Sequence, residues 1–256
     1  MTAWLPDAPW YVLAALPFVV FAAYTMFGAT GFGSSIIAVP AIAHFFPLTF
    51  AVPLVTALDC TATANASSRQ WRHADFGEFR HLLPAMLIGI GAGTTLLVNL
   101  PRGPALLALG VFVTGYGLYL FAGRREWRAL PPLWAWPIGF VGGVVSVLFG
   151  TGGPIYMVYL SARIRDKTTL RATSSVLVTL SVFVRTAVFV GTGLLTHAPL
   201  LVVAAALLPF MFGGFWFGNR LHHALSRAGV LRLIAGLLVA NGLLLALRAS
   251  AMLRGD

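Results

Sequence analysis

Two glycine-rich stretches in apolar surroundings carry the residue types best suited to bind an anion. They are GATGFGSS at 28–35 and FGTGGP at 149–154. Glycine permits the backbone dihedral angles that end a helix, and a helix that begins directly afterwards presents unpaired N–H groups and a partial positive charge. Such a helix start can bind an anion without a basic side chain. FGTGGP lacks the lysine of a soluble phosphate-binding loop, so we exclude that alternative.

We expect the substrate to be bound at these two breaks by glycine, hydroxyl residues and one proline. Serine and threonine can cap a helix or donate a hydroxyl group, and proline suits the first turn of a helix. The predicted substrate-binding residues at the breaks are Gly31, Gly33, Ser34, Ser35, Gly150, Thr151, Gly152, Gly153 and Pro154. Close packing of membrane helices at glycine is the alternative interpretation.

Two ionisable residues lie inside apolar segments, where a charge is costly and is therefore a candidate for function. Asp59 occurs in LVTALDCTATANAS and Arg185 in LVTLSVFVRTAVFV. Counting from the segment ends places them at depths that differ by roughly 9 Å. One hypothesis is a structural ion pair. The other is that Arg185 attracts the anion and Asp59 takes up a proton or acts as a gate.

Patterns typical of catalysis or of metal binding are absent from the sequence. It has no HExxH motif and no cluster of cysteine and histidine, so we expect neither a metal nor a cofactor. Its single cysteine, Cys60, allows no internal disulfide bond. An intramembrane serine protease would need a histidine at the membrane depth of a serine such as Ser34, and no histidine has a matching position. We therefore predict that the protein is not an enzyme.

The composition is that of an all-α membrane protein with several spans. Of the 256 residues, 59% are hydrophobic and 9% are charged, whereas about 25% are charged in a typical soluble domain. The net charge of +10 is located in short loops between apolar segments. This distribution indicates contact with a lipid bilayer and gives no support for a nucleic-acid partner.

The chain divides into ten apolar segments. Eight are long enough to cross a hydrocarbon core of about 30 Å, and two are too short. Each short segment follows one of the glycine-rich stretches. The ten segments are 10–28, 33–46, 48–66, 81–100, 104–122, 133–149, 152–162, 169–190, 199–218 and 229–248.

The segments follow the same order in both halves, which predicts an internal repeat. LLPAMLIGIGAG from Leu82 matches LLPFMFGGFWFG from Leu207, an offset of 125 residues. The glycine breaks match at a slightly smaller offset. Because five segments is an odd number, the second repeat would enter the membrane from the opposite side, as in many secondary transporters. The predicted units are the membrane repeats 1–123 and 133–256 and a cytoplasmic linker, 124–132.

The distribution of positive charge favours ten crossings over eight. With the N-terminus outside, the inner loops would be 67–80, 123–132, 163–168 and 219–228. Of the 17 Lys and Arg residues, thirteen lie in or beside these loops. If both short segments dipped into the membrane and returned, 67–80 and 123–132 would lie outside and most of this bias would vanish. The positive-inside rule therefore predicts that both termini lie outside.

These features together resemble the TauE/SafE sulfite exporter family, bacterial membrane permeases for sulfur-containing anions. The resemblance covers nearly the whole chain and is carried by GATGFGSSIIAVPAI, SRQWRHADFGEFRHLLPAMLIGIGAG and LFGTGGPIYMVYL. It implies transport of sulfite, sulfoacetate or related organosulfonates, generally outward across the inner membrane. The first glycine cluster departs from the pattern because Phe32 separates Gly31 from Gly33, so the two halves would contribute unequally to the site.

We therefore expect a secondary transporter for a small anion, working by alternating access, with both termini periplasmic. A membrane potential of about 100 mV, inside negative, favours exit of an anion by about 2.3 kcal/mol per charge. An anion channel, a permease of the same fold for another small organic anion, and a membrane assembly factor without a solute are the alternatives. The sequence leaves the coupling ion and a homo-oligomeric state open.

Overall fold

The chain folds into α-helices in every part that the structure describes. The computed structural model describes residues 10–30, 33–66, 74–122, 130–221 and 227–254. A 3-10 turn, η2 (Pro132–Trp134), precedes the sixth helix. The helices are α1 (Trp10–Thr30), α2 (Ser34–Ala43), α3 (Leu48–Ala66), α4 (Phe76–Asn99), α5 (Arg102–Phe121), α6 (Ala135–Phe149), α7 (Gly153–Arg163), α8 (Lys167–Gly191), α9 (Ala198–Leu221) and α10 (Arg227–Arg254).

Seven helical segments in the described part of the chain are long and apolar enough to cross a membrane, which confirms the polytopic helical class. They belong to α1, α4, α5, α6, α8, α9 and α10. Helix α3, with 19 residues, was expected as a full-length span, but its stretch Leu48–Ala64 falls among the shorter apolar helices together with α2. The prediction of eight full-length segments among ten is therefore not confirmed, and it stays a prediction.

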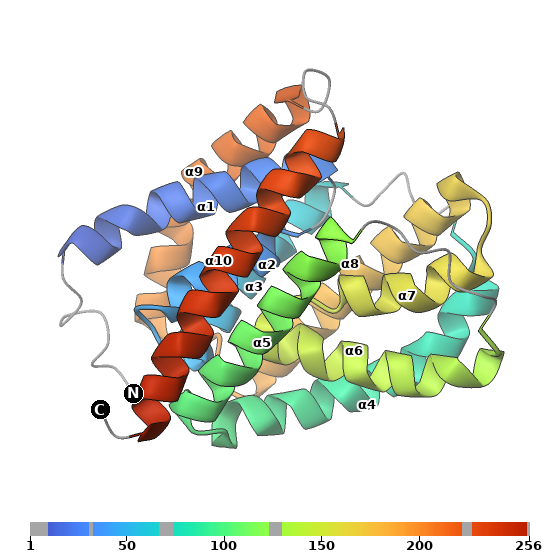
Figure 1. Ribbon diagram of the computed structural model, residues 1–256, viewed down its shortest axis with the longest axis horizontal. Coiled ribbons are helices and arrows are strands. Elements are labelled where there is room, and N and C mark those ends of the chain that lie inside the picture. The colour runs from blue at the N-terminus through green and yellow to red at the C-terminus, as the bar shows by residue number, and fades with distance from the viewer. Residues whose placement is uncertain (1–9, 31–32, 67–73, 123–129, 222–226, 255–256) are drawn as a thin grey trace.

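Three pairs of helices make the most extensive contacts in the described structure: α1 with α9, α4 with α6, and α5 with α10 (Figure 1). Glycine permits the close approach in each pair. A Cβ atom at Gly89 of α4 would overlap the carbonyl oxygen of Phe140 in α6. A Cβ atom at Gly214 of α9 would likewise overlap the carbonyl oxygen of Phe21 in α1. These glycines hold backbone against backbone, as the packing interpretation of small residues in membrane helices requires.

Equivalent positions of the two predicted repeats make equivalent contacts. The glycines of α9 lie 125 residues after those of α4. Their contact residues in α6 lie 119 residues after those in α1, and the two glycine breaks have the same offset of 119 residues. The related pairs are Gly89–Phe140 with Gly214–Phe21, and Gly93–Val144 with Gly218–Thr25.

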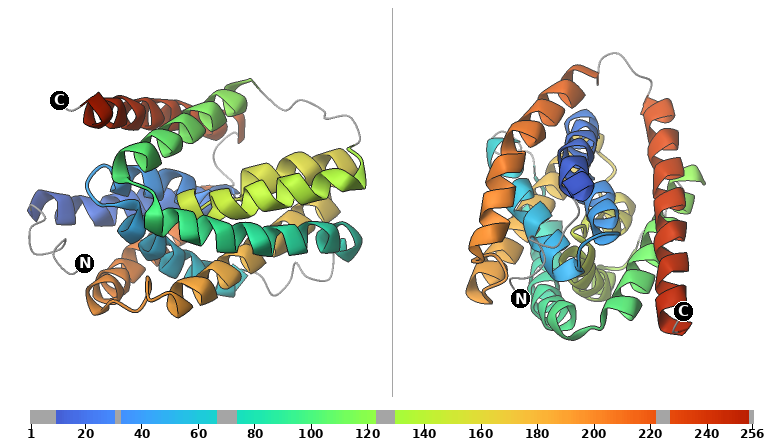
Figure 2. Two further views of the ribbon diagram at one scale, coloured as in Figure 1. Left: turned by 90° about the horizontal axis from the view of Figure 1, so that it is seen from below. Right: turned by 90° about the vertical axis from the view of Figure 1, so that its left-hand side faces the viewer.

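Helices α5 and α10, each the fifth helix of its predicted repeat, pack antiparallel. A Cβ atom at Gly103, near the start of α5, would lie 3.1 Å from Leu253, near the end of α10. Near the end of α5, a Cβ atom at Gly117 would lie 2.8 Å from Val239. Residue numbers thus rise along α5 while they fall along α10, and the two helices lie side by side in Figure 2 as well.

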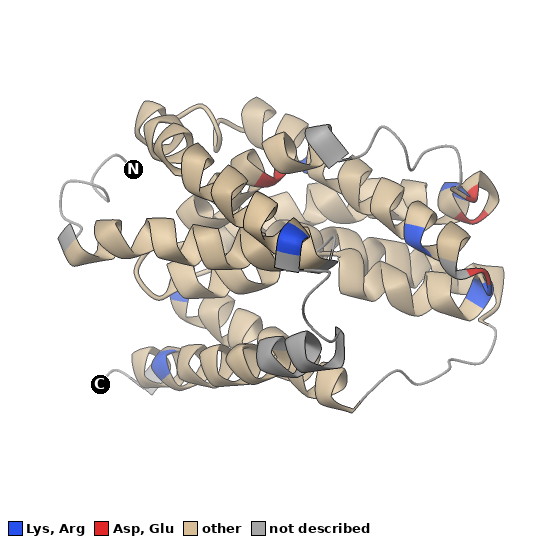
Figure 3. Cartoon of the chain, turned by 90° about the horizontal axis from the view of Figure 1, so that it is seen from above, with Lys and Arg blue, Asp and Glu red and all other residues tan. Residues whose placement is uncertain are grey.

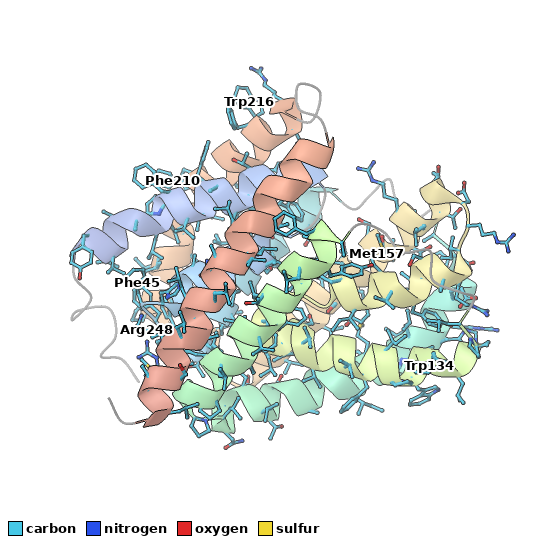
Figure 4. The ribbon with its side chains drawn as sticks, viewed as in Figure 1. Phe45, Trp134, Met157, Phe210, Trp216 and Arg248 are labelled. Atoms are coloured by element: carbon cyan, nitrogen blue, oxygen red, sulfur yellow. The ribbon has the colours of Figure 1, made fainter. Side chains whose placement is uncertain are left out.

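The outer surface is predominantly apolar. In Figure 3, charged residues are sparse over the helices and several gather at one end of the molecule. Large apolar side chains instead face outward, among them Trp134, Phe210 and Trp216, which are labelled in Figure 4. The guanidinium carbon of Arg220 lies 3.8 Å from the ring centre of Trp216. A surface of this kind is suited to lipid contact.

Candidate functional site

Both predicted breaks are local changes of backbone direction at glycine. Gly33 precedes α2 with a φ angle of +100°, and Gly150 ends α6 with a φ angle of +79°. Residues with a side chain rarely adopt this conformation, so glycine is required at both positions. Pro154 lies in the first turn of α7. Its missing N–H costs nothing there, because that group would have no partner within the helix.

The first turn of α2 packs directly on the break between α6 and α7. A Cβ atom at Gly150 would lie 2.8 Å from the Cβ atom of Ser35 and 3.0 Å from a methyl group of Val39. A cavity of about 30 Å³ lies where the two breaks meet. This volume accommodates about one or two water molecules. Residues that the sequence separates by more than a hundred positions therefore line one small space.

Both helix starts at this cavity lack a side-chain cap. The N-cap residues are Gly33 for α2 and Gly152 for α7, and no side chain caps either helix. Elsewhere, α4 is capped by Asp75 and α8 by Asp166, whose carboxylates accept hydrogen bonds from backbone N–H groups. The first N–H groups of a helix have no partner within it. At α7, Pro154 has no N–H and the N–H of Ile155 donates to the carbonyl oxygen of Gly152 at 3.0 Å. Among these first-turn residues, Gly153 therefore presents the N–H that is left for a ligand. The helix dipole adds a partial positive charge.

Asp59 of α3 lies beside this cavity within a cage of hydroxyl groups. Its Oδ1 atom accepts hydrogen bonds from Tyr24 at 2.7 Å and Ser34 at 2.8 Å, and its Oδ2 atom accepts one from Ser35. The carboxylate is thereby held by donors from α1 and α2. In this conformation the hydroxyl groups of Ser34 and Ser35 donate to Asp59, and both residues also line the cavity.

Arg185 of α8 is completely buried behind the cavity wall. Its Nη2 atom lies 3.6 Å from Oδ2 of Asp59, and its Nη1 atom donates to the carbonyl oxygen of Ser146. The hydroxyl group of Ser146 is in turn hydrogen-bonded to that of Ser181 at 2.8 Å. The two charged residues are thus in contact, although their positions in the sequence predicted that they lie at different depths. The contact is the one expected from a structural ion pair.

Most of the sequence-predicted site residues line the cavity. Those that do so are Gly33, Ser34, Ser35, Asp59, Gly150, Thr151, Gly152 and Gly153. Pro154 is buried in the adjoining helical turn, and Arg185 is not part of the cavity lining. Gly31 lies outside the described residues. The described part of the chain contains no group of three or more His, Cys, Asp or Glu side chains that could hold a metal ion.

Sequence reasoning missed four hydroxyl residues of this region: Tyr24, Ser146, Tyr156 and Ser181. Tyr24 contacts Asp59, and the other three line the cavity. Ser146 and Tyr156 lie within about one or two helical turns of the second break. Tyr24 likewise lies about one helical turn before the first glycine-rich stretch, which begins at Gly28. A search for hydroxyl residues near each glycine break would therefore have found these three.

Comparisons with known proteins place the chain in a family. Residues 16–245 match the family model described as "Sulfite exporter TauE/SafE". The chain is 31% identical over 192 residues to the "Probable inner membrane transporter protein TsaS" of Comamonas testosteroni, an alignment that covers 74% of this chain and 80% of that protein. No solved structure matches the chain significantly. With a match over most of its length, a helical membrane fold and a cavity at its two glycine breaks, the chain belongs to the TauE/SafE family of membrane transport proteins.

Proposed function

We propose that the protein is a secondary transporter that moves small sulfur-containing anions, such as sulfite, sulfoacetate or related organosulfonates, outward across the inner membrane. Membership of the TauE/SafE family and similarity to a protein named as an inner membrane transporter support this class of function. The single observation that carries the proposal is the presence of two uncapped helix starts at one cavity. Their N–H groups and dipoles favour an anion.

The proposed architecture is an inverted repeat of two five-helix units with ten crossings. Under ten crossings, the fifth and tenth helices run in opposite directions. If α2 and α7 dipped into the membrane and returned, α5 would be the fourth crossing and α10 the eighth, and the two would run parallel. The antiparallel packing of α5 and α10 therefore supports ten crossings. Ten crossings also agree with the excess of positive charge in the inner loops.

The small size of the cavity favours a carrier over a channel. About 30 Å³ is far less than the roughly 300 Å³ or more of a typical ligand pocket. A conducting channel requires a continuous water-filled path, whereas a carrier passes through states in which the site is closed. We interpret the described conformation as a closed state that must open to admit the substrate. Current steps from single channels in a planar bilayer would contradict this part of the proposal.

Asp59 is proposed to couple or gate the movement of the substrate. Its carboxylate holds the hydroxyl groups of Ser34 and Ser35, which are also candidate ligands of the anion. A change in the charge of Asp59 would therefore free donors at the site. Arg185 is proposed to favour the anion indirectly, because its positive charge, 3.6 Å from Asp59, offsets the negative charge of that carboxylate beside the cavity.

Transport into proteoliposomes tests the proposed function. The full-length protein is reconstituted, and entry of labelled sulfite and sulfoacetate is measured for the wild type, Thr151→Val and Gly152→Leu. Thr151→Val removes one lining hydroxyl group, and Gly152→Leu fills the helix start with a side chain. Gly91→Leu is the matched control, because no atom lies within 4 Å of a Cβ at Gly91.

We expect transport by the wild type and the control, and its loss in Gly152→Leu. Other small organic anions in the same assay separate the sulfur-specific proposal from a permease of broader range. Equal transport by the wild type and Gly152→Leu would refute the site, and no transport of any anion by the wild type would refute the function.

A further inference from the structure

Tyr156 brings a buried hydroxyl group without a hydrogen-bond partner to the cavity. The side chain lies in α7, is 0% exposed and belongs to the cavity lining. Its hydroxyl oxygen has no hydrogen bond within the described structure. The hydroxyl group of Ser181 lies close enough to that of Tyr156 to interact with it, but its hydrogen bond of defined geometry, at 2.8 Å, is made with Ser146. A buried tyrosine hydroxyl group usually has a partner, so an orphaned one at a cavity indicates a missing ligand.

The position of the Tyr156 ring is fixed by the second break. A Cβ atom at Gly142 or at Gly152 would lie less than 3.0 Å from ring atoms of Tyr156. The aromatic ring therefore occupies the space that the two glycines leave free. Since Gly152 is also the N-cap of α7, the phenol ring is packed against the helix start whose first residue, Gly153, lines the same cavity.

The charge balance of the cavity narrows the class of anion. Asp59 is the only charged side chain among the described residues that line it, and Arg185 behind the wall lies against Asp59. The lining therefore supplies dipoles and hydroxyl donors but no unmatched positive charge. Burial of a second uncompensated charge is costly. Because this cost rises with the charge of the ligand, the environment favours a monovalent anion over a divalent one.

We propose that Tyr156 is a specificity-determining residue that donates a hydrogen bond to an oxygen atom of a monovalent oxyanion, a sulfonate or hydrogen sulfite, at the start of α7. This inference rests on the proposed function and specifies a contact and a charge state for the same site. A sulfonate has only acceptor oxygens, and hydrogen sulfite has at least two, so the hydroxyl group acts as donor to one of them. A divalent anion of similar shape, such as sulfate, binds less tightly because of its higher charge.

Binding to the purified full-length protein tests the inference. Titration calorimetry measures the affinity for methanesulfonate and for sulfate, with hydrogen sulfite as a third probe. The variants are Tyr156→Phe and its matched control Tyr159→Phe. Tyr159 lies one turn along the same helix, and its hydroxyl group donates to Glu78 at 2.8 Å, away from the cavity.

We expect the wild type to bind methanesulfonate at least about 10-fold more tightly than sulfate. Loss of a hydrogen bond to a charged group should weaken methanesulfonate binding about 10- to 100-fold in Tyr156→Phe. Tyr159→Phe should stay within about 2-fold of the wild type. The unfolding temperatures without ligand provide a second measurement. Tyr156→Phe removes an unsatisfied group and should unfold no lower than the wild type, whereas Tyr159→Phe removes a formed bond and should unfold lower.

The outcomes separate the two proposals. If the wild type binds none of the anions, the proposed function fails. If it binds methanesulfonate and Tyr156→Phe binds it equally well, the function stands and the role of Tyr156 is refuted. Sulfate binding as tightly as methanesulfonate refutes the charge selection. A clearly lower unfolding temperature of ligand-free Tyr156→Phe would show that its hydroxyl group has a partner within the protein and would also overturn the inference.

Discussion

The carboxylate of Asp59 lies 3.6 Å from the guanidinium group of Arg185, and this contact joins α3 of the first half to α8 of the second. Both side chains are buried. The carboxylate is further satisfied by three hydroxyl donors, whereas Nε and Nη2 of Arg185 have no hydrogen-bond partner in the described structure. The charge of Arg185 is therefore compensated mainly by Asp59, whereas the charge of Asp59 is stabilised by the hydroxyl donors as well.

Removal of the negative charge at Asp59 is expected to destabilise the protein. Asp59→Asn leaves Arg185 as an uncompensated buried charge, which costs on the order of 3–5 kcal/mol. Arg185→Gln should cost less, since the hydroxyl donors still hold the carboxylate. In the double variant much of the loss should be recovered. The stability of the three variants is measured by thermal unfolding in detergent, with tryptophan fluorescence as the signal. Additive losses in the double variant would contradict the pairing.

Substitution of Gly150 should disrupt the second break. An alanine there must adopt a positive φ angle, which costs roughly 1–3 kcal/mol, and its Cβ would lie 2.8 Å from that of Ser35. We expect Gly150→Ala to lower stability by at least about 2 kcal/mol and to abolish transport. Gly115→Ala in α5 is the control, because a Cβ there meets no atom within 4 Å. Equal behaviour of the two variants would show that the turn tolerates a side chain.

The two short helices were the most predictable part of the site. The sequence predicted segments beginning at residues 33 and 152, and the helices begin at Ser34 and Gly153. Glycine gives such a clear signal because few other residues adopt a positive φ angle. The start of α4 was less visible. It was expected at residue 81, but the helix begins at Phe76 and is capped by the carboxylate of Asp75. Its first turn is polar, so a search for apolar residues does not find it.

The pattern of apolar residues in the sequence does not show which residues of distant segments are in contact. Tyrosine is common in apolar segments, and nothing near Tyr24 in the sequence indicates that its hydroxyl group meets Asp59 in α3. The orphaned hydroxyl group of Tyr156 is likewise a property of the packed structure. Periodicity assigns residues to helices, but the partner of each polar group depends on which helices pack together.

The far end of α7 is held by an ion pair that should contribute modestly to stability. Nε and Nη2 of Arg163 donate to Oε1 of Glu78 in α4, at 2.9 and 2.6 Å. The side chains are 27% and 15% exposed, so solvent screens part of the interaction. A double-mutant cycle of Glu78→Gln and Arg163→Gln should give a coupling of about 1 kcal/mol that falls with added salt. Arg165→Gln, at an exposed arginine, is the control. A coupling near zero at low salt would show that the pair contributes nothing.

The number of crossings can be tested by the accessibility of two loops. Ten crossings place residue 131 inside the cell and residue 197 outside, whereas the eight-crossing alternative places both outside. Pro131→Cys and His197→Cys are each introduced into a Cys60→Ala background and treated in intact cells with a membrane-impermeant maleimide. Both positions are exposed in the structure. We expect immediate labelling at residue 197 and labelling at residue 131 only after the cells are permeabilised. Labelling of both in intact cells would support eight crossings and would contradict the inverted arrangement inferred from the antiparallel packing of α5 and α10.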